Sequence, residues 1–409
     1  MARAAFLVET SENEARERRS KALKSGNPTW LWPEVTIAEW LETMGHISEA
    51  LSCVLAGRPS TIPPSDPRTF SLACYTSGVG PLLGYWVEQG KLVVPNDLGE
   101  LLALHLEHAR ARAKTAESNS RRLVSELVGD GVPVVILMGA HSAHAYFPEP
   151  ATRPSSDLDL LIPFEFAAQA EVSLARRGLQ CVARNRRESS WKRADSPSEP
   201  RSLWLAHADD PWCVDLQSSL DFSAGPGARI VRFDSADPIG TSDPWPLNPE
   251  AGALSQPLLF LHLAVHASGG LHSLTLLRMV EIILVVRSDI HSGRLNWDEF
   301  LHVGAGTNAL GAAYPALRMA DMLAPGTIPG AVLSISAEIA PPRAHMIVDK
   351  LEPATAHRVD RASIAEHFMW VSGFSGWCRQ LVSDIMPGSE SWAIYEKRAY
   401  RLLRGRVSR

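Results

Sequence analysis

Cysteine is scarce in this sequence, and basic residues are fewer than acidic ones. Each shortage argues against certain classes of protein. The five cysteines are scattered over 409 residues without a C-x-x-C pair. This argues against a disulfide framework or a cysteine-rich zinc site, and it favours a reducing cytoplasm. The 40 Lys and Arg residues are outnumbered by 45 Asp and Glu residues, which gives a formal net charge of −5. Because proteins that bind duplex nucleic acid usually carry excess positive charge, nucleic acid is not the expected partner.

Long apolar runs are missing as well. The two longest, at 258–267 and 282–286, contain histidine or are short, whereas a membrane-spanning helix needs about 20 apolar residues. The N-terminus, MARAAFLVETSENEARERRSK, turns charged after a few apolar residues and lacks the apolar core of a signal peptide. We therefore expect a cytoplasmic protein with no membrane association.

Periodicity predicts helices at both ends of the chain and strands in the middle. Residues 1–30 are polar and are expected to be flexible. Residues 31–129 repeat apolar side chains at helical spacing, as in IAEWLETMGHISEALSCVL, and residues 251–409 do so again. Between them, residues 130–250 combine strand and helix patterns. The predicted fold class is α+β, with a central mixed-sheet core flanked by N-terminal and C-terminal helical regions.

Several strands are expected in the central part. VPVVILM at 132–138 is a β-branched run that ends at Gly139, and DLDLL at 157–161 alternates Asp with Leu in the period of a strand. Pro163 and Gly178 bound a predicted helix. Further strands are predicted at 179–183, 202–206 and 212–217.

The alternation at 157–161 places two carboxylates on one face. Side chains at i and i+2 of a strand point to the same side, so Asp157 and Asp159 are expected to lie next to each other. Asp215, in the apolar strand WCVDLQ, would be costly to bury unless it were paired or bound a cation. Mg²⁺ prefers carboxylate and phosphate oxygens. The three aspartates are therefore candidate catalytic residues and metal ligands for one or two ions.

The turn after the first of these strands is a candidate phosphate site. A strand that ends at glycine and passes directly into a helix lets backbone N–H groups approach phosphate oxygens. Gly139, Ala140 and Ser142 occupy these positions. Each signal has a simpler interpretation on its own, since D-x-D pairs are frequent on strand edges and glycine after a strand is usually only a turn. Their order along the chain is more specific than any single part.

These motifs resemble the core of an uncharacterised bacterial nucleotidyltransferase-like family in the polymerase-β-type superfamily. VPVVILMGAHSAHAYFPEPATRPSSDLDLLIP is similar to the family pattern of an apolar strand, glycine, a Pro-containing loop, Arg and D-[IL]-D. CVDLQSSLD resembles its V-D-L-H strand, and HLAVHASGGLHSLTLLRMVEIILVV resembles its helical segment with a His and an Arg, so the resemblance extends over residues 70–325. The matching positions in the central motif are Gly139, Tyr146, Pro148, Pro150, Arg153, Asp157, Leu158, Asp159, Leu160 and Leu161.

The resemblance implies Mg²⁺-dependent transfer from a nucleoside triphosphate, expected to be ATP, with two ions on the three aspartates and the turn glycine at the phosphates. Arg153, His266 and Arg278 would also bind the nucleotide. Three residues depart from the pattern, because Met138 stands where the family has Lys, Gln217 where it has His, and Ala140 where many superfamily members have Ser. A lysine–phosphate contact contributes about 1.5–3 kcal/mol, so the departure at Met138 bears on turnover more than on fold.

Three functions stay open at this point. The chain transfers a nucleotidyl group to a hydroxyl or phosphate of a small-molecule or peptide acceptor, transfers the γ-phosphoryl group of ATP to a peptide or natural-product hydroxyl, or binds nucleotide without catalysis at a decayed site. The first two reactions have similar metal requirements.

His262 and His266 have i, i+4 spacing that suits zinc, but HLAVH lacks the Glu of H-E-x-x-H, so packing within a helix is the favoured interpretation.

Overall fold

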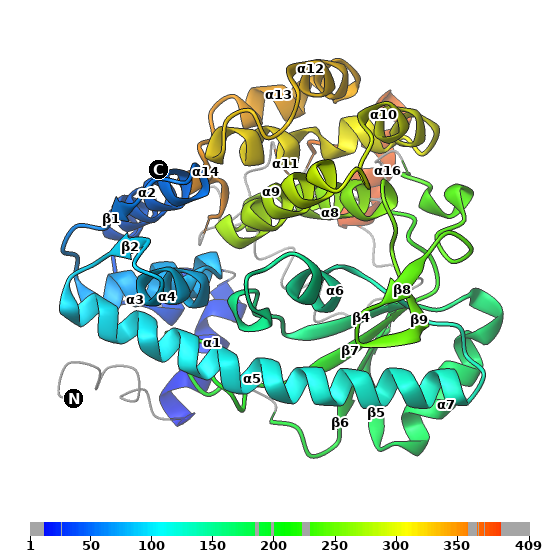
Figure 1. The fold of residues 1–409 in the computed structure, drawn as a ribbon, viewed down its shortest axis with the longest axis horizontal. Helices are drawn as coiled ribbons and strands as arrows, with labels where there is room; N and C mark the ends of the chain where they lie inside the picture. Colours follow the sequence, from blue (N-terminus) through cyan, green and yellow to red (C-terminus); the bar gives the residue numbers. More distant parts are fainter. Residues whose placement is uncertain are drawn as a thin grey trace.

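The computed structural model describes residues 12–25, 27–184, 188–197, 200–222, 230–358, 366, 368–371 and 373–385. A mixed sheet of seven strands lies among helices (Figure 1), with the strand order β5-β6-β7-β4-β3-β9-β8. The strands are β3 (Val135–Ile136), β4 (Asp157–Leu161), β5 (Leu179–Arg184), β6 (Glu188–Arg193), β7 (Cys213–Gln217), β8 (Asp243–Trp245) and β9 (Asn248–Ala253). This confirms the α+β class with a mixed sheet and helical regions on either side of it in the sequence.

The centre of the sheet is β4, whose two neighbours run in opposite directions. β4 pairs parallel with β7 and antiparallel with β3. Two side chains of β4, Leu158 and Leu160, are buried in one core with α5 (Asn96–Gly129) and α7 (Ala167–Arg176). Because side chains alternate along a strand, the two aspartates of β4 point to the opposite face of the sheet.

Three of the predicted strands are confirmed with small shifts of their ends. They are the strands at 157–161, 179–183 and 212–217, which form β4, β5 and β7. The strand predicted at 132–138 is confirmed only at Val135–Ile136. β6, β8 and β9 are not predicted, because their sequences are polar or contain Pro and Gly. Pairing with the rest of the sheet, and not the local pattern, makes them strands.

The strand predicted at 202–206 does not form. Leu203 and Trp204 are buried in an irregular segment, so this apolar run fills the core without joining the sheet. Side chains of the N-terminal region satisfy its backbone instead. Trp32 Nε1 donates to the Leu203 carbonyl at 2.6 Å, and Ser71 Oγ donates to the Trp204 carbonyl at 3.1 Å. An apolar run without clear periodicity does not distinguish these two outcomes.

Helices dominate the N-terminal region. They are α1 (Glu12–Ser25), η2 (Pro28–Leu31), α2 (Ile37–Leu55), α3 (Pro67–Ser77), α4 (Gly80–Glu88) and α5, together with a short parallel pairing of β1 (Ser60–Thr61) and β2 (Leu92–Val93). α1 lies in the segment expected to be flexible, yet Arg18 links it to the following chain through the Leu31 carbonyl and Glu34. Residues 1–11 of that segment lie outside the described residues.

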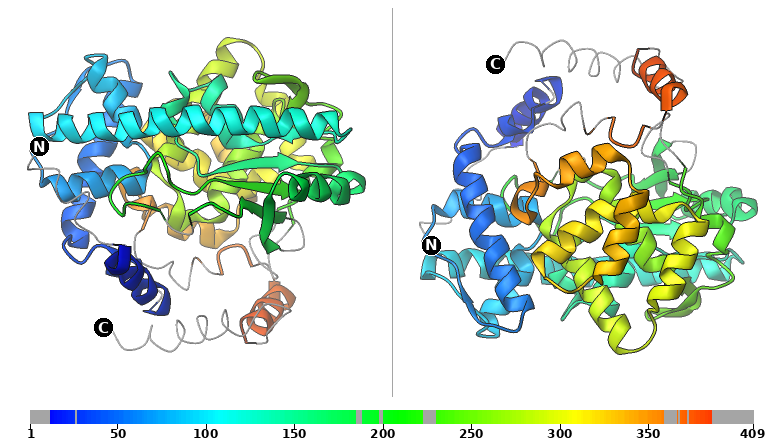
Figure 2. Two further views of the ribbon diagram at one scale, coloured as in Figure 1. Left: turned by 90° about the horizontal axis from the view of Figure 1, so that it is seen from below. Right: turned by 90° about the horizontal axis from the view of Figure 1, so that it is seen from above.

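The two ends of the 34-residue helix α5 belong to different cores. Near its beginning, Leu98 and Leu102 pack in a core that N-terminal and C-terminal helices share, whereas Leu123 and Leu127 near its end pack against the sheet. Figure 2 shows the helix lying along both parts of the molecule. The domain border predicted after residue 129 therefore falls at the end of a helix that both parts share.

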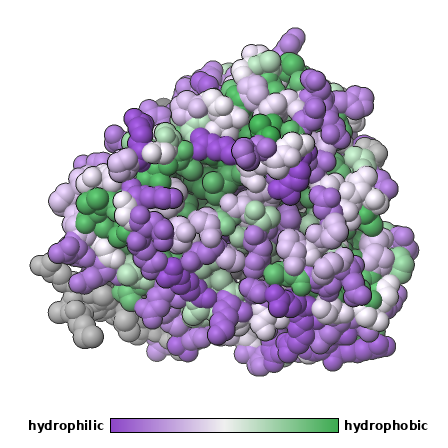
Figure 3. Space-filling view, viewed as in Figure 1, coloured by the Kyte–Doolittle hydropathy of each residue, from purple (hydrophilic) through white to green (hydrophobic). Residues whose placement is uncertain are grey.

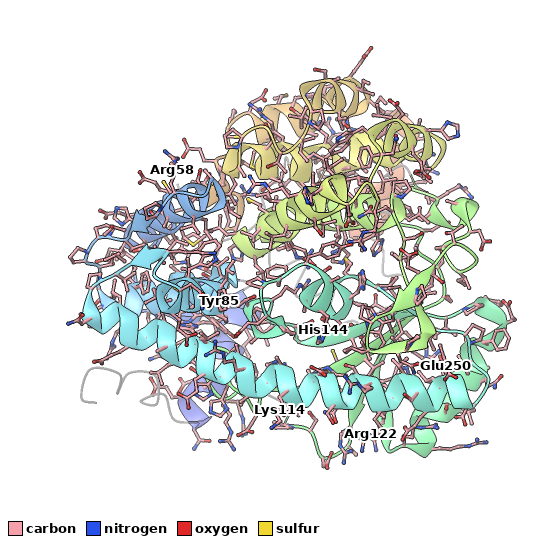
Figure 4. All side chains as sticks on the ribbon, in the orientation of Figure 1. Arg58, Tyr85, Lys114, Arg122, His144 and Glu250 are labelled. Atoms are coloured by element: carbon pink, nitrogen blue, oxygen red, sulfur yellow. The ribbon has the colours of Figure 1, made fainter. Side chains whose placement is uncertain are left out.

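The outer side of α5 is polar. Lys114, Arg121 and Arg122 are exposed there, and much of the surface in this view is hydrophilic (Figure 3). Figure 4 shows Lys114 and Arg122 on α5 and His144 on the adjacent helix α6 (Met138–Ala145). A polar outer side and an apolar inner side let α5 cover the sheet while one side stays in solvent.

Helices of the C-terminal region lie above the sheet in Figure 1 and are seen from outside in the right-hand view of Figure 2. They are α8 (Leu258–Gly269), α9 (Leu276–His291), α10 (Trp297–Gly306), α11 (Ala309–Leu323), α12 (Gly330–Ile339), α13 (Pro342–Val348), α14 (Pro353–Ala356) and α16 (Gly373–Ile385). Residues 386–409 of the predicted helical region lie outside the described residues. Within the described part of the chain, no helix combines the length and the apolar character needed to cross a membrane.

Buried histidines are expected to make the stability of the fold depend on pH. His105 of α5 is 4% exposed and His262 of α8 is 5% exposed. Burial lowers the pKa of each to about 4. An unfolded histidine begins to bind a proton near pH 6.5, so the stability that each neutral ring contributes is present above that pH and is lost as the pH falls toward 4. We expect a loss of up to about 3 kcal/mol per histidine at pH 4.

Urea unfolding at a series of pH values between 7 and 4 measures this loss. The variant His262→Gln is expected to have a shallower dependence of unfolding free energy on pH than the wild type, whatever its absolute stability. His302→Gln, at an exposed position of α10, is the matched control and should keep the wild-type slope. Equal slopes for all three proteins would refute the assignment.

Candidate active site

Two adjacent parallel strands bring the three predicted aspartates together. In the ladder between β4 and β7, Asp159 is the partner of Asp215, and Asp157 is the partner of Cys213. All four are half-buried and lie on the same face of the sheet, because β4 and β7 share the alternation of half-buried and buried residues. One ligand atom each from Asp157, Cys213 and Asp215 lies within 4.8 Å of the other two. The predicted convergence of the aspartates is therefore present in the fold.

The charges of these carboxylates disfavour one another. Burial, together with the charges of Asp157 and Asp215, raises the pKa of Asp159 well above its usual value. Burial also raises the pKa of Asp215, while a hydrogen bond from Ser190 on β6 opposes that rise. Asp215 Oδ1 is buried without a hydrogen-bond partner among the described residues. A cluster of this kind gains stability when a cation binds, so the donor set fits a divalent metal ion.

The segments that enter β4 and β7 are held in place from α5. Arg112, which is 8% exposed, donates to the backbone carbonyl of Ser155 at 3.2 Å and to those of Asp210 and Pro211, each at 2.8 Å. Ser155 Oγ in turn donates to Asp157 Oδ1 at 2.9 Å. One guanidinium group therefore fixes the starts of both carboxylate-bearing strands, and Ser155 orients the first carboxylate.

The predicted glycine turn lies beside these strands. The chain leaves β3 and enters α6 at once, with a positive φ of 21° at Met138. The Leu137 amide donates to the Asp159 carbonyl at 3.0 Å, which places the start of α6 next to β4. A Cβ atom on Gly139 would lie 2.9 Å from Arg153 Nη1 and 3.1 Å from a serine hydroxyl. Glycine at this position lets the Arg153 guanidinium lie against the backbone.

Replacing Gly139 with alanine is expected to move Arg153 and lower stability by about 1–3 kcal/mol, as overpacking in a tight site does. Gly45→Ala is the matched control, because Gly45 lies within α2 and nothing stands within 4 Å of its added Cβ. That control should be neutral or stabilising by up to about 1 kcal/mol. Chemical denaturation measures the unfolding free energy of both variants. Equal values for the two would contradict the close packing at Gly139.

A buried ion pair joins the loop before β4 to helix α9. Arg153 donates from Nε to Glu281 Oε1 at 3.1 Å and from Nη2 to Glu281 Oε2 at 3.0 Å. The side chains are 13% and 3% exposed, respectively. Burial disfavours the charged guanidinium, but the attraction of Glu281 outweighs it, and the pKa of Arg153 is raised. The predicted nucleotide-binding residue Arg153 therefore has a carboxylate partner within the protein.

A second cation faces the aspartates from the helices above the sheet. Arg278 of α9 donates from Nη1 to His266 Nδ1 at 2.7 Å. Burial and the charge of Arg278 lower the pKa of His266 well below its usual value, so the ring is neutral and carries its hydrogen on Nε2. The Arg278 amide donates to Thr275 Oγ1, the N-cap of α9. His266 and the helix cap therefore fix the position of Arg278.

The predicted site residues divide between two neighbouring cavities. The larger, of about 410 Å³, is lined by the three aspartates and by Arg153, His266 and Arg278, as well as by Met138, Gln217 and Glu281. Gly139 and Ala140 line a smaller cavity of about 50 Å³ instead, which also borders Arg153 and Asp157. Ser142 is fully buried and lines neither cavity. Six of the nine predicted residues therefore surround one space, and Ser142 is separated from it.

Two further residues of this site were not selected from the sequence. Cys213 precedes Asp215 by two positions on the same strand, so the period of two that placed the aspartates would also have found it. Glu188 lines the larger cavity from β6, a strand that the sequence did not predict. Glu188 had no comparable signal, because β6 joins the site only through its pairing with β7.

Carboxylates on adjacent parallel strands, with a glycine at a neighbouring helix start, form the arrangement that the sequence resemblance implied for a nucleotidyltransferase. The chain belongs to the family described as uncharacterised nucleotidyltransferase, which matches residues 63–325. It is therefore a member of a transferase family whose name implies a nucleotide substrate. No curated protein and no solved structure matches the chain.

Proposed function

We propose that this protein transfers a nucleotidyl group from a nucleoside triphosphate, ATP being the first to test, to a hydroxyl or phosphate oxygen of a small-molecule or peptide acceptor in the cytoplasm. The observation that carries the proposal is the convergence of Asp157, Asp159 and Asp215 at a cavity that Arg278 faces from the opposite side. Family membership supports the same class of reaction.

The three aspartates would hold two Mg²⁺ ions, which when bound supply positive charge at the attacking and leaving oxygens of the transfer. The buried, unpaired Asp215 Oδ1 supports this assignment, as does the raised pKa of Asp159. Asp215 is the residue that we propose to receive the proton of the acceptor, because it lines the cavity and its Oδ1 has no hydrogen-bond partner among the described residues.

Cationic side chains of the cavity would position the phosphates. Arg278 is held by His266 and by the cap of α9, so little further ordering is needed when its guanidinium binds an anion. Arg153 would contribute only in part, because Glu281 already occupies two of its donors. Met138 lines the cavity without charge. Arg278 therefore takes the role that the family pattern assigns to lysine.

Two labelled nucleotides test the proposal. The full-length chain is incubated with Mg²⁺ and a panel of acceptors, once with ATP labelled at the α-phosphate and once with ATP labelled at the γ-phosphate. We expect label from the α position in the product, with release of pyrophosphate. Transfer of γ label alone would replace the proposal with a kinase reaction. Mg²⁺-dependent binding of ATP in calorimetry without any transfer would mark a binding module.

A further inference from the structure

A thiol stands among the carboxylates of the candidate metal site. Cys213 is on β7, half-buried, next to Asp157 across the parallel ladder and two positions from Asp215 on the same face. Its sulfur lies within 4.8 Å of ligand oxygens of both aspartates. It is a free thiol whose hydrogen bond to the Ser156 carbonyl is long, at 3.7 Å. The side chain is therefore placed to bind whatever the carboxylates bind.

The composition of this donor set bears on the choice of metal. Mg²⁺ takes oxygen ligands and gains nothing from sulfur, whereas Zn²⁺, Co²⁺ and Cd²⁺ bind thiolate, with carboxylate oxygens completing the site. Asp215 Oδ1, buried and without a partner among the described residues, belongs to the same cluster. Two carboxylates and one thiol at this spacing match a thiophilic ion that keeps an open position for a further ligand.

We propose that Cys213 is a ligand of the metal centre and that Asp157, Cys213 and Asp215 together bind a thiophilic divalent ion. The S–H bond breaks on binding, the sulfur electron pair binds the ion, and the proton leaves to solvent. The inference relies on the proposed function only for placing a metal at these carboxylates. The thiophilic ion would occupy one of the two metal positions proposed above for Mg²⁺, since both assignments use Asp157 and Asp215. The inference predicts that the chain binds Zn²⁺ or Co²⁺ there without nucleotide.

Cobalt provides a direct test, because a cobalt–thiolate bond gives a charge-transfer absorption band in the near ultraviolet that a carboxylate does not. Co²⁺ is titrated into the metal-free full-length chain. The wild type and Cys181→Ser, which removes an exposed cysteine of β5, should both show the band. Cys213→Ser should lose the band, and Zn²⁺ should abolish it in the wild type. A wild type without the band, or a Cys213→Ser variant that keeps it, would overturn the proposal.

Alkylation of the wild type provides a second measurement that needs no variant. Cys181 and Cys213 are alkylated with iodoacetamide in the presence and absence of Zn²⁺, and the modified peptides are quantified by mass spectrometry. We expect Zn²⁺ to slow modification of Cys213 and to leave that of Cys181 unchanged. Equal protection of both cysteines, or of neither, contradicts the proposal. Both measurements are independent of turnover, so failure to transfer a nucleotidyl group would leave their result interpretable.

Discussion

Asp159→Asn is expected to reduce the rate of transfer by on the order of 10³-fold, equivalent to about 4 kcal/mol in the activation free energy. The substitution keeps the shape of the side chain but removes a charge that we propose to hold metal between Asp157 and Asp215. Asp157→Asn should have an effect of similar size. The labelled-ATP assay measures both variants, and Asp243→Asn, at an exposed position of β8, is the matched control that should retain full activity.

The same variant is expected to be more stable than the wild type when no metal is present. A raised pKa in the folded state means that the ionised carboxylate of Asp159 is disfavoured by folding. The free-energy cost of ionising Asp159 in the folded protein is absent below its unfolded pKa of about 3.9. This cost develops as the pH rises through the pKa that Asp159 has in the folded protein. Thermal unfolding in EDTA at neutral pH should therefore show a higher Tm for Asp159→Asn, whereas Asp243→Asn should leave Tm unchanged. Full activity in Asp159→Asn would refute its assigned role.

Glu281→Ala should destabilise the protein by about 3–5 kcal/mol, because it leaves the buried Arg153 guanidinium without its partner. Glu117→Ala removes the partly exposed partner of Arg121 on α5 and is the control, with an expected cost of about 0.5 kcal/mol or less. Urea denaturation gives both values.

The double variant Arg153→Met, Glu281→Ala distinguishes two causes of the destabilisation. One is the loss of the ion pair, and the other is the Arg153 guanidinium left buried without a partner. If the buried charge causes the loss, the double variant will be more stable than Glu281→Ala alone. A Glu281→Ala variant as stable as the surface control would show that the ion pair does not hold the loop before β4 against α9.

Local patterns in the sequence predicted the parts of the site that depend on neighbours in the chain. The alternation of Asp and Leu predicted both β4 and the face on which Asp157 and Asp159 lie, because side-chain direction in a strand repeats every two residues. Pro163 and Gly178 marked the ends of the segment that contains α7, because each favours a backbone conformation at a helix boundary.

Local patterns could not predict contacts between segments that are far apart in the sequence. Arg153 and Glu281 are 128 positions apart, and nothing in either local sequence indicates the pairing. Their ion pair means that Arg153 is a less available phosphate ligand than the sequence suggested. The buried run at Leu203 was predicted as a strand, because apolar residues that fill a core and those that join a sheet look alike without their partners.

The sharing of α5 between two cores determines which piece of the chain can be inherited as a unit. At about 1.5 Å per residue, α5 extends for about 50 Å. A fragment that began after residue 129 would lose Leu123 and Leu127, the part of α5 that packs with Leu158 and Leu160. The family match begins before α3 and ends just after α11. Recombination between relatives is therefore expected to exchange the sheet only together with the helices that precede it.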